Sequence, residues 1–406
     1  MTAIANLPDI RPSLLLDFAN SGRVDPRIQC TRASSATCFG PDGKLRTVAA
    51  NVPRIDYDPA TGKCLGLLVE ESRTNLIRHS NSFTASAWTK SDVTVQTVAD
   101  MFANGLQATK LTPGVGTYKT VNQTFNLPDN TAVTASVFAK AGEFNTVRLG
   151  VRDKTNVIVS GHFNLATGVA SHPEIEAKYV GDGWWRVSLH VASLAAGTAI
   201  PLVHIYAINN DTLITPGDGV SGLYISGVQV EVGSFPTSYI PTEGSAVTRA
   251  TDVVYVNAVS FVNQNEGTLL TEFKVRTLNV THAQYVSVLR KESGATTEGV
   301  GSFIDINTAV ISARVRNSSA GDPSSIANYP LTENETCKMC VSYGYSLGRS
   351  AFNGSAVSTS SRGVPTLDTL YIGSNTTTTP PMNGTIKSIT YYPKALPNTV
   401  LQEITK

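Results

Sequence analysis

The sequence predicts an all-β fold with several domains: an irregular N-terminal β module followed by two β-sandwiches. Charged residues make up only 16% of the 406 residues, against about a quarter in an average protein. Short apolar stretches alternate with polar residues at a period of two, as half-buried strands do. Glycine, asparagine and proline separate these stretches at short intervals, which favours antiparallel strands joined by tight turns over βαβ units.

The first part of the chain predicts short, irregular strands rather than a regular sheet. Residues 14–18 form a brief apolar run, and residues 65–69 form a second one. Turn chemistry lies at residues 41–44 and 58–62, where proline, aspartate and glycine come together. We therefore expect residues 1–80 to form a separate β module.

Two longer blocks have the strand pattern of sandwiches. Residues 81–250 predict one β-sandwich, and residues 257–406 predict a second. In the first block, residues 133–138 alternate apolar and polar positions, and residues 223–230 form a late strand. Residues 386–391 have the same character in the second block. A polar stretch between the blocks marks the boundary.

Composition and charge exclude several classes of protein. The net charge is +1, from 32 basic and 31 acidic residues. No basic block is present to coat a phosphate backbone, so we expect no nucleic-acid binding. No apolar run approaches the roughly 20 residues of a membrane-spanning helix, and the N-terminal residues lack the pattern of a signal peptide. The odd count of five cysteines is not that of a disulfide scaffold, and no motif predicts a cofactor.

Two short motifs have a chemical and a structural interpretation. Residues 344–348 match the G-x-S-x-G nucleophile elbow, but a strand and a turn follow them in place of the required helix, so a hairpin loop is favoured. Cys337 and Cys340 form a lone C-x-x-C without the further ligands that a structural zinc site needs. Packed or surface thiols on a strand are favoured there. No catalytic residue and no metal ligand is predicted.

Carboxylates near residue 70 predict a structural network rather than an acid–base pair. Glu70 and Glu71 are neighbours, so on a strand they point to opposite faces. Arg54, Arg73 and Asn75 lie close to them in the sequence. We expect ion pairs and hydrogen bonds among these residues.

Two further groups of residues, an aspartate pair and three cysteines, each allow two interpretations. Asp56 and Asp58 share a strand face and either touch a calcium ion or, as is more common, cap a turn. Cys30, Cys38 and Cys64 crowd into the N-terminal module. A disulfide between two of them and packed, reduced thiols are both open.

Aromatic side chains are the main clue to binding. Flat rings cover the apolar faces of sugars while polar neighbours bond the hydroxyl groups. The alternation places Trp185 with the core and Trp184 on the opposite face with Arg186, Ser188 and His190. Trp184 therefore either faces a glycan or packs against a neighbouring domain, and domain packing is the more common outcome.

Several segments resemble modules of tailed-bacteriophage appendage proteins, the tail fibres and head spikes. The N-terminal part carries this resemblance in residues 32–37, 51–58, 66–76 and 88–90. The jelly roll of these proteins, which resembles carbohydrate-binding modules, is matched by residues 183–187, 228–242 and 247–252. A similarity to laminin-G and concanavalin-like, that is lectin-like, sandwiches lies in residues 267–269, 352–354, 384–389 and 394–396.

The resemblance implies a protein of the virion exterior that is made in the cytoplasm of a bacterial host. It also implies other virion proteins as partners and a homo-oligomer, such as the trimer common among fibre proteins. The N-terminal module would anchor the protein, and the sandwiches would recognise host surface glycans. Two rival functions stay open. One is a purely structural part of a collar, baseplate or capsid, and the other is a glycan-degrading tailspike, whose usual long parallel β-helix these strand patterns do not predict.

One hairpin of the second sandwich offers a candidate ligand site. Tyr343, Tyr345, Arg349 and Asn353 combine stacking surface with hydrogen-bonding groups, and loops on a rigid scaffold are where binding groups usually lie. The alternative is that both tyrosines fill the core and that Asn353 makes an Asn-Gly turn. Together with Trp184, these are the candidate ligand-binding residues.

Overall fold

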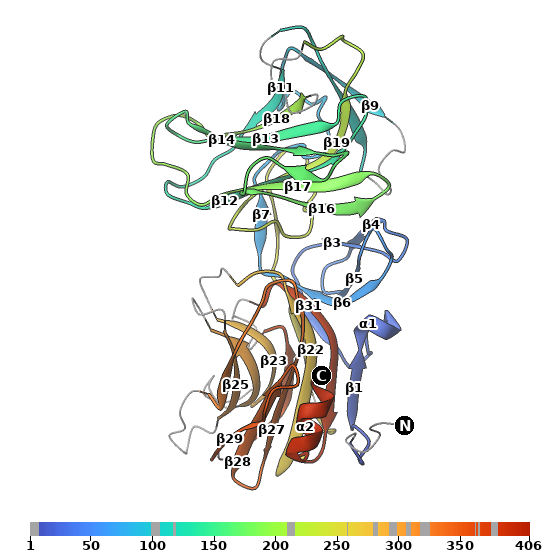
Figure 1. Ribbon diagram of the computed structural model, residues 1–406, viewed down its shortest axis with the longest axis vertical. Coiled ribbons are helices and arrows are strands. Elements are labelled where there is room, and N and C mark those ends of the chain that lie inside the picture. The colour runs from blue at the N-terminus through green and yellow to red at the C-terminus, as the bar shows by residue number, and fades with distance from the viewer. Residues whose placement is uncertain are drawn as a thin grey trace.

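The computed structural model covers the whole chain, and the fold is all-β. The structure describes residues 8–98, 106–116, 119–208, 216–257, 259–278, 283–291, 299–305, 310–316, 325–361, 363, 366–374 and 381–406. Within them the chain forms two β-sandwiches placed end to end along the long axis of the molecule (Figure 1). The prediction of an all-β fold with sandwich domains is confirmed.

The first sandwich packs two six-stranded antiparallel sheets against each other. One sheet has the strand order β16-β17-β12-β19-β10-β9. Its strands are β9 (Val93–Val98), β10 (Ala108–Pro113), β12 (Val133–Lys140), β16 (Ile175–Gly181), β17 (Trp184–Val191) and β19 (Leu223–Val232). The other sheet has the order β15-β14-β13-β18-β11-β8. Its strands are β8 (Thr89–Ser91), β11 (Thr120–Thr124), β13 (Thr146–Arg152), β14 (Ile158–Asn164), β15 (Val169–Ala170) and β18 (Leu202–Ile208).

The core of the first sandwich follows from the alternation in its strands. Every second side chain of a central strand points between the sheets, so apolar residues at these positions meet in one core. Val137 on β12, Leu149 on β13 and Val187 on β17 are fully buried there. The buried residues of this core run from Ile77 to Val230. One continuous stretch of chain therefore builds the first sandwich.

The second sandwich packs an eight-stranded sheet against a seven-stranded sheet. The larger sheet has the order β29-β28-β27-β22-β31-β6-β5, and β1 also pairs with β31. Its strands are β1 (Leu14–Asp17), β5 (Arg54–Tyr57), β6 (Cys64–Val69), β22 (Glu266–Val275), β27 (Thr336–Gly344), β28 (Leu347–Phe352), β29 (Ser358–Ser361) and β31 (Gly384–Tyr392). The smaller sheet runs in the order β2 (Gln29–Thr31), β21 (Val253–Asn257), β30 (Thr369–Ile372), β23 (Gln284–Arg290), β24 (Gly299–Ile304), β25 (Val310–Arg316) and β26 (Ala327–Pro330).

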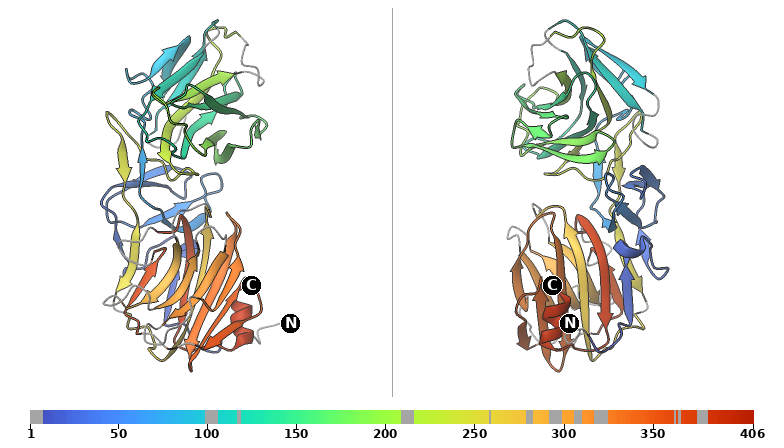
Figure 2. Two further views of the ribbon diagram at one scale, coloured as in Figure 1. Left: turned by 90° about the vertical axis from the view of Figure 1, so that its left-hand side faces the viewer. Right: turned by 45° about the vertical axis from the view of Figure 1, so that its right-hand side comes forward.

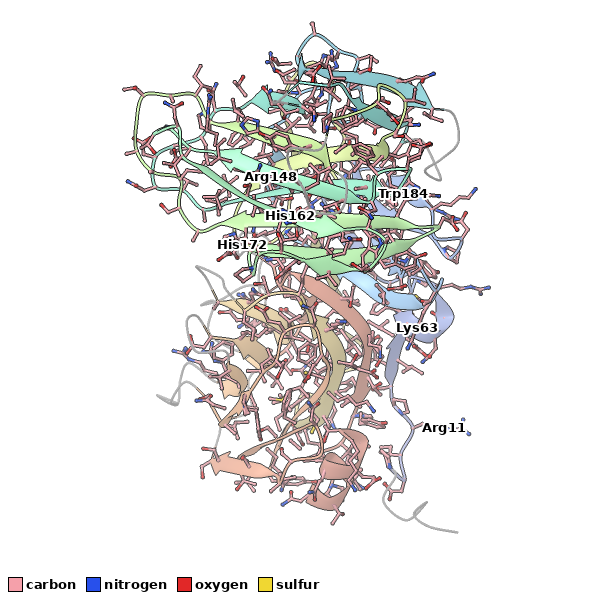
Figure 3. The ribbon with its side chains drawn as sticks, turned by 45° about the horizontal axis from the view of Figure 1, so that its top comes forward. Arg11, Lys63, Arg148, His162, His172 and Trp184 are labelled. Carbon is pink, nitrogen blue, oxygen red and sulfur yellow. The ribbon has the colours of Figure 1, made fainter. Side chains whose placement is uncertain are left out.

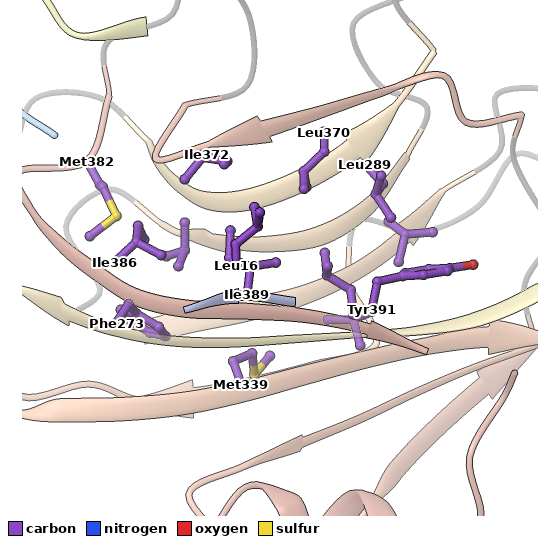
Figure 4. Close-up of a cluster of buried hydrophobic side chains, with 14 of the residues drawn as sticks. Leu16, Phe273, Leu289, Met339, Leu370, Ile372, Met382, Ile386, Ile389 and Tyr391 are labelled. Atoms are coloured by element: carbon purple, nitrogen blue, oxygen red, sulfur yellow. The ribbon is translucent and has the colours of Figure 1, made fainter. Parts of the chain in front are cut away.

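The core of the second sandwich joins the two ends of the chain. Figure 4 shows Leu16 of β1 among side chains of the last strands, close to Ile389 of β31. These two residues are direct neighbours in the pairing of β1 with β31. Phe273 and Ile386 lie in the same cluster and are fully buried. The N-terminal strand is thus part of this domain.

The structure therefore corrects the prediction that residues 1–80 form a separate module. β6 pairs with both β31 and β5, and β2 pairs with β21. Leu67 and Val69 of β6 are fully buried in the core of the second sandwich. The hairpin of β3 (Ala36–Phe39) and β4 (Leu45–Val48) makes a small sheet of its own. Short strands with one apolar face cannot bury that face alone, so most of this segment completes sheets formed by strands far along the chain.

Two short strands connect the sandwiches. β7 (Arg73–Asn75) leads into the first sandwich and β20 (Val247–Arg249) leads out of it, and the two pair antiparallel. We call this pair the neck, and Figure 2 shows it between the sandwiches. The first sandwich is thus inserted into the second, whose strand β21 begins at Val253, before the predicted boundary at residue 257.

The described part of the chain contains two short helices. They are α1 (Phe18–Ser21), which follows β1, and α2 (Asn398–Ile404), which ends the chain. Leu401 of α2 packs against Cys340 of β27 on the outside of the larger sheet. No helix of the described residues is long and apolar enough to cross a membrane.

Candidate functional site

A cleft of about 540 Å³ opens where the two sandwiches and the N-terminal strands meet. Ligand sites often lie at domain junctions and commonly measure roughly 300–1,000 Å³. The walls carry basic, acidic, hydroxyl and amide side chains from both sandwiches. Across the described ranges, no group of His, Cys, Asp and Glu side chains is placed to hold a metal ion.

One wall of the cleft is the outer face of β16 and β17. Alternation in β17 buries its apolar side chains in the core and leaves Arg186, Ser188 and His190 along the cleft. Lys178 extends this wall from β16, and its amine lies 3.8 Å from a carboxylate oxygen of Asp58. The Lys178 side chain is 51% exposed, so it is available to a ligand.

The opposite wall belongs to the second sandwich. Arg276 follows β22, and its guanidinium donates a hydrogen bond to the carbonyl of Pro236 at 3.1 Å. The same group lies 3.7 Å from a Glu70 oxygen and keeps 33% of its side chain exposed. The Thr277 hydroxyl donates to Glu333 at 3.2 Å. This wall therefore offers charged donors and acceptors facing those of β16 and β17.

The surroundings of two buried carboxylates in the cleft shift their pKa values in opposite directions. Asp56 accepts a hydrogen bond from the backbone N–H of Phe39 at 2.8 Å, and burial raises the pKa of Asp56. Burial would also raise the pKa of Glu70, but Arg249 and Arg54 hold it well below its ordinary value. Glu70 therefore stays ionised as part of an ion network, while Asp56 takes up a proton more readily.

The residues around Glu70 form a buried network. Arg54 and Arg249 each lie 3.0 Å from a Glu70 oxygen. Arg32 lies 2.9 Å from Asp252, which also pairs with Arg54. No side chain in these pairs is more than 2% exposed. All of them belong to the segments that resemble phage appendage modules, so those segments meet at the junction of the two sandwiches.

Glu71, Arg73 and Asn75 stabilise the neck. The Nε of Arg73 donates to Glu71 at 2.7 Å, and the guanidinium lies 4.8 Å from the ring centre of Phe235. Asn75 is fully buried, and its amide donates to the carbonyl of Val228 at 3.1 Å. These contacts tie the neck to the first sandwich.

The structure does not bring the predicted hairpin residues together. Tyr343 is fully buried and its hydroxyl is hydrogen-bonded inside the core, so the expectation that it meets a sugar is wrong. Tyr345 lies at the turn between β27 and β28 and is 73% exposed. Asn353 lies beyond the other end of β28, where its side-chain oxygen accepts a hydrogen bond from the N–H of Lys338 at 2.8 Å. Arg349 is half-buried on β28 between them, and binding by Tyr345 and Arg349 stays a prediction.

Trp184 is also buried, at 1% exposure. It lies on the outer face of its sheet, but Leu45 of the β3–β4 hairpin and Tyr239 cover that face. The structure thus has Trp184 packed against a neighbouring element, which is the second of its two interpretations, and no glycan can stack on it. Figure 3 shows Trp184 at the edge of the first sandwich nearest the N-terminal strands.

The remaining acidic and serine motifs make turns. Residues 344–348 form the tight turn between antiparallel β27 and β28, with positive φ at Tyr345 and Ser346. No helix follows this turn, so the nucleophile elbow is absent. An Asp58 oxygen accepts hydrogen bonds from the N–H groups of Ala60 and Thr61, so Asp58 caps a turn.

All five cysteines are free thiols. The disulfide alternative for Cys30, Cys38 and Cys64 is therefore wrong, and the thiols are packed instead. Burial raises the pKa of Cys38 to about 12. Cys337 and Cys340 belong to separate clusters on the two faces of β27, so they cannot share a metal ion.

Sequence analysis did not identify the cleft. The alternation in β17 did place Arg186, Ser188 and His190 on one face, and these three residues line the cleft. This alternation was the one indication of the site that the sequence contained. Lys178 and Arg276 could not be predicted to belong to the same site. Nothing in the sequence indicates that β16 and the end of β22 lie opposite each other.

Comparisons with known proteins give similarities of fold only. No protein-family model matches the chain, and no curated protein matches it. The CBM40 module of the Ruminococcus gnavus IT-sialidase has a TM-score of 0.30 and 16% identity, covering 35% of this chain and 84% of that one. The CBM22-2 xylan-binding domain of Paenibacillus barcinonensis Xyn10C has a TM-score of 0.28 and 11% identity, covering 40% and 98%. Domains LG4-5 of the mouse laminin alpha1 chain have a TM-score of 0.25 and 13% identity, covering 76% and 93%. Similarity at this level carries no information on ligand or activity.

Proposed function

We propose that this chain is a glycan-binding, adhesive protein of the exterior of a bacteriophage particle and that it has no catalytic activity. The observation that carries the binding function is the cleft of about 540 Å³ between the two sandwiches. The bacteriophage origin is supported by the segments that resemble appendage modules, since these segments supply the buried network beside the cleft.

The side chains of the cleft suit a sugar ligand. Each sugar hydroxyl donates one hydrogen bond and accepts others, so a site needs both kinds of partner. Lys178 and Arg276 offer donors, and Glu176 and Glu333 offer acceptors. Ser188 supplies a hydroxyl that serves as either. A bound glycan would therefore contact both sandwiches at once.

The architecture also supports a projecting protein. The first sandwich is an insertion carried on the neck, and the second sandwich contains the described ends of the chain. We propose that the second sandwich contacts other virion proteins as part of a homo-oligomer, such as a trimer. The chain would reach this place after synthesis in the bacterial cytoplasm.

A glycan array probed with the full chain tests binding, and two substitutions test the site. Lys178→Ala and Ser188→Ala should each weaken binding of an array hit by about tenfold, because each removes a hydrogen-bonding group from the cleft. Lys63→Ala removes an exposed lysine from the connection between β5 and β6 and should leave binding unchanged (Figure 3). Unchanged binding by both cleft variants would reject the cleft as the glycan site.

The rival functions give different results. A structural component would bind no glycan, and particles lacking it would adsorb to host cells normally. A glycan-degrading tailspike would release reducing ends from the bound polysaccharide. Labelling of intact particles with an antibody against the chain tests the virion location, and an absence of label would reject it.

A further inference from the structure

The first sandwich has a second polar face, on the sheet that does not line the cleft. This face is the outer side of β13, β14 and β18, and we call it the distal face. In β13 the apolar residues turn inward, so Arg148, Gly150 and Arg152 point outward. Figure 3 shows Arg148 and His162 together on this side of the first sandwich. The cleft and the distal face therefore use opposite sheets.

Strand pairing places Gly150 at the centre of the distal face. Gly150 pairs with His204 on β18 and with Ser160 on β14. Arg148 and Arg152 lie two residues away along β13, one on each side of Gly150. Gly150 adds no side chain between them, and Ser160 fills the adjacent space, since a Cβ at Gly150 would lie 3.1 Å from the Ser160 Cβ. Arg148 and Arg152 are half-buried, so part of each side chain reaches solvent.

Aromatic and hydroxyl groups hold the arginines in place. Two nitrogens of Arg148 donate to the Ser160 hydroxyl, at 3.2 and 2.7 Å. Its guanidinium lies 5.2 Å from the ring centre of Tyr206. Arg152 donates from one terminal nitrogen to the carbonyl of Ile200 at 3.1 Å. The two cations are therefore fixed by neutral partners.

Some buried nitrogen atoms of the distal face have no hydrogen-bond partner in the described part of the chain. The ion pairs among the described residues include neither Arg148 nor Arg152. The Nε of Arg152 and both ring nitrogens of His204 are buried without a hydrogen-bond partner. His204 is only 9% exposed, and burial together with the charges of Arg152 and Arg148 lowers its pKa to about 4. Positive charge that no neighbouring carboxylate neutralises creates a positive potential, which attracts anionic ligands.

We propose that the distal face binds a carboxylate of an acidic polysaccharide between Arg148 and Arg152. Guanidinium groups bind carboxylates through paired hydrogen bonds, which favours arginines over lysines at such a site. The open, flat shape of a sheet face suits a polymer better than a small enclosed ligand. The Tyr206 ring beside Arg148 gives the sugar ring an apolar surface.

The test uses the full chain and polygalacturonate, whose residues all carry carboxylates. Its methyl ester is the matched neutral polymer. Affinity electrophoresis at low salt should give binding to polygalacturonate at least tenfold tighter than to the ester. Arg148→Gln and Arg152→Gln should each weaken binding about tenfold or more. Lys63→Gln removes the same charge from a distant exposed position and should change the affinity less than twofold.

Further variants separate this site from loss of folding and from the cleft. Arg148→Lys and Arg152→Lys keep the charge but lose the paired hydrogen bonds, so they should bind more weakly than the wild type while melting at the same temperature. Lys178→Ala in the cleft should leave polygalacturonate binding unchanged, so failure of the distal face and failure of the proposed glycan cleft are distinguishable. Equal binding of acid and ester, full binding by both arginine variants, or binding of dextran sulfate without binding of polygalacturonate would overturn the proposal.

Discussion

Arg54 and Glu70 form an ion pair of 3.0 Å in which neither side chain is more than 2% exposed. Arg54 lies on β5 and Glu70 directly follows β6, so the pair joins two N-terminal strands of the second sandwich. Arg249, on the neck strand β20, contacts the same carboxylate. The buried carboxylate of Glu70 therefore links the neck to the second sandwich.

Replacing Glu70 by Gln should destabilise the protein strongly. The substitution removes the buried carboxylate partner of Arg249 and leaves Arg54 with Asp252 alone, and breaking a buried ion pair in this way costs about 3–5 kcal/mol. Urea denaturation measures the free energy of unfolding. Glu143→Gln is the matched control because the carboxylate of Glu143, paired with Lys110 at 3.0 Å, is 53% exposed, and its loss should cost no more than about 1 kcal/mol. Equal effects of the two substitutions would show that the buried network adds little stability.

The insertion of the first sandwich predicts which fragments fold. Residues 72–250 contain the whole of the first core, so this fragment should show β-type circular dichroism and its own cooperative melt. Residues 257–406 lack β1, β2, β5, β6 and β21, so this fragment should aggregate or stay unfolded.

A deletion makes the converse test of the same architecture. Asn75 and Val247 are direct neighbours in the neck, so a short Asn-Gly turn can replace residues 76–246. The shortened chain should melt cooperatively, because its two sheets keep all of their strands. A folded 257–406 fragment together with an unfolded deletion chain would contradict the insertion.

The positions of strands could be predicted from the sequence, but the pairing of strands that lie far apart in the chain could not. Alternation predicted residues 133–138, and the structure has β12 (Val133–Lys140) there. β1 shows why strand pairing could not be predicted. It has only two buried leucines, Leu14 and Leu16, and many strands have an apolar face against which such a short segment could pack. Only the completed sheet determines its partner β31. The cleft was missed for the same reason, since its walls are brought together by the neck.

The turn between β27 and β28 should tolerate substitution, whereas the buried tyrosine before it should not. Tyr345→Asn with Ser346→Gly should stabilise the protein by about 0.5–1 kcal/mol, because both positions have positive φ and Asn-Gly is the preferred pair in such turns. Tyr343→Phe should cost about 1–2 kcal/mol, since the Tyr343 hydroxyl donates to the Asn263 carbonyl at 2.7 Å in the core. Thermal melts should show a higher melting temperature for the turn variant and a lower one for Tyr343→Phe. An unchanged melting temperature for Tyr343→Phe would show that its hydroxyl makes no net contribution.

His204 should make the protein less stable in mild acid. Burial and the neighbouring arginines lower the pKa of His204 from its ordinary 6.5 to about 4. The unfolded chain therefore binds a proton below pH 6.5 that the folded chain does not, and stability should fall between pH 6.5 and 4, by up to about 3 kcal/mol. His204→Gln should flatten the decline in this window, measured by urea denaturation at each pH. His172→Gln, at an exposed position, is the control and should leave the decline intact.

The same histidine should make polysaccharide binding tighten in mild acid. The groups that face His204 are Arg148 and Arg152 from β13 and Asn122 from β11, with Tyr206 beside it on β18. A bound carboxylate offsets the arginine charges, so the pKa of His204 rises in the complex and binding takes up a proton. Affinity for polygalacturonate should therefore increase severalfold from pH 7 to pH 5, where the polymer is still ionised. His204→Gln should bind with an affinity that does not change over this range. If the wild type shows no tightening while both arginine variants still lose binding, the arginines hold the carboxylate without any electrostatic link to His204.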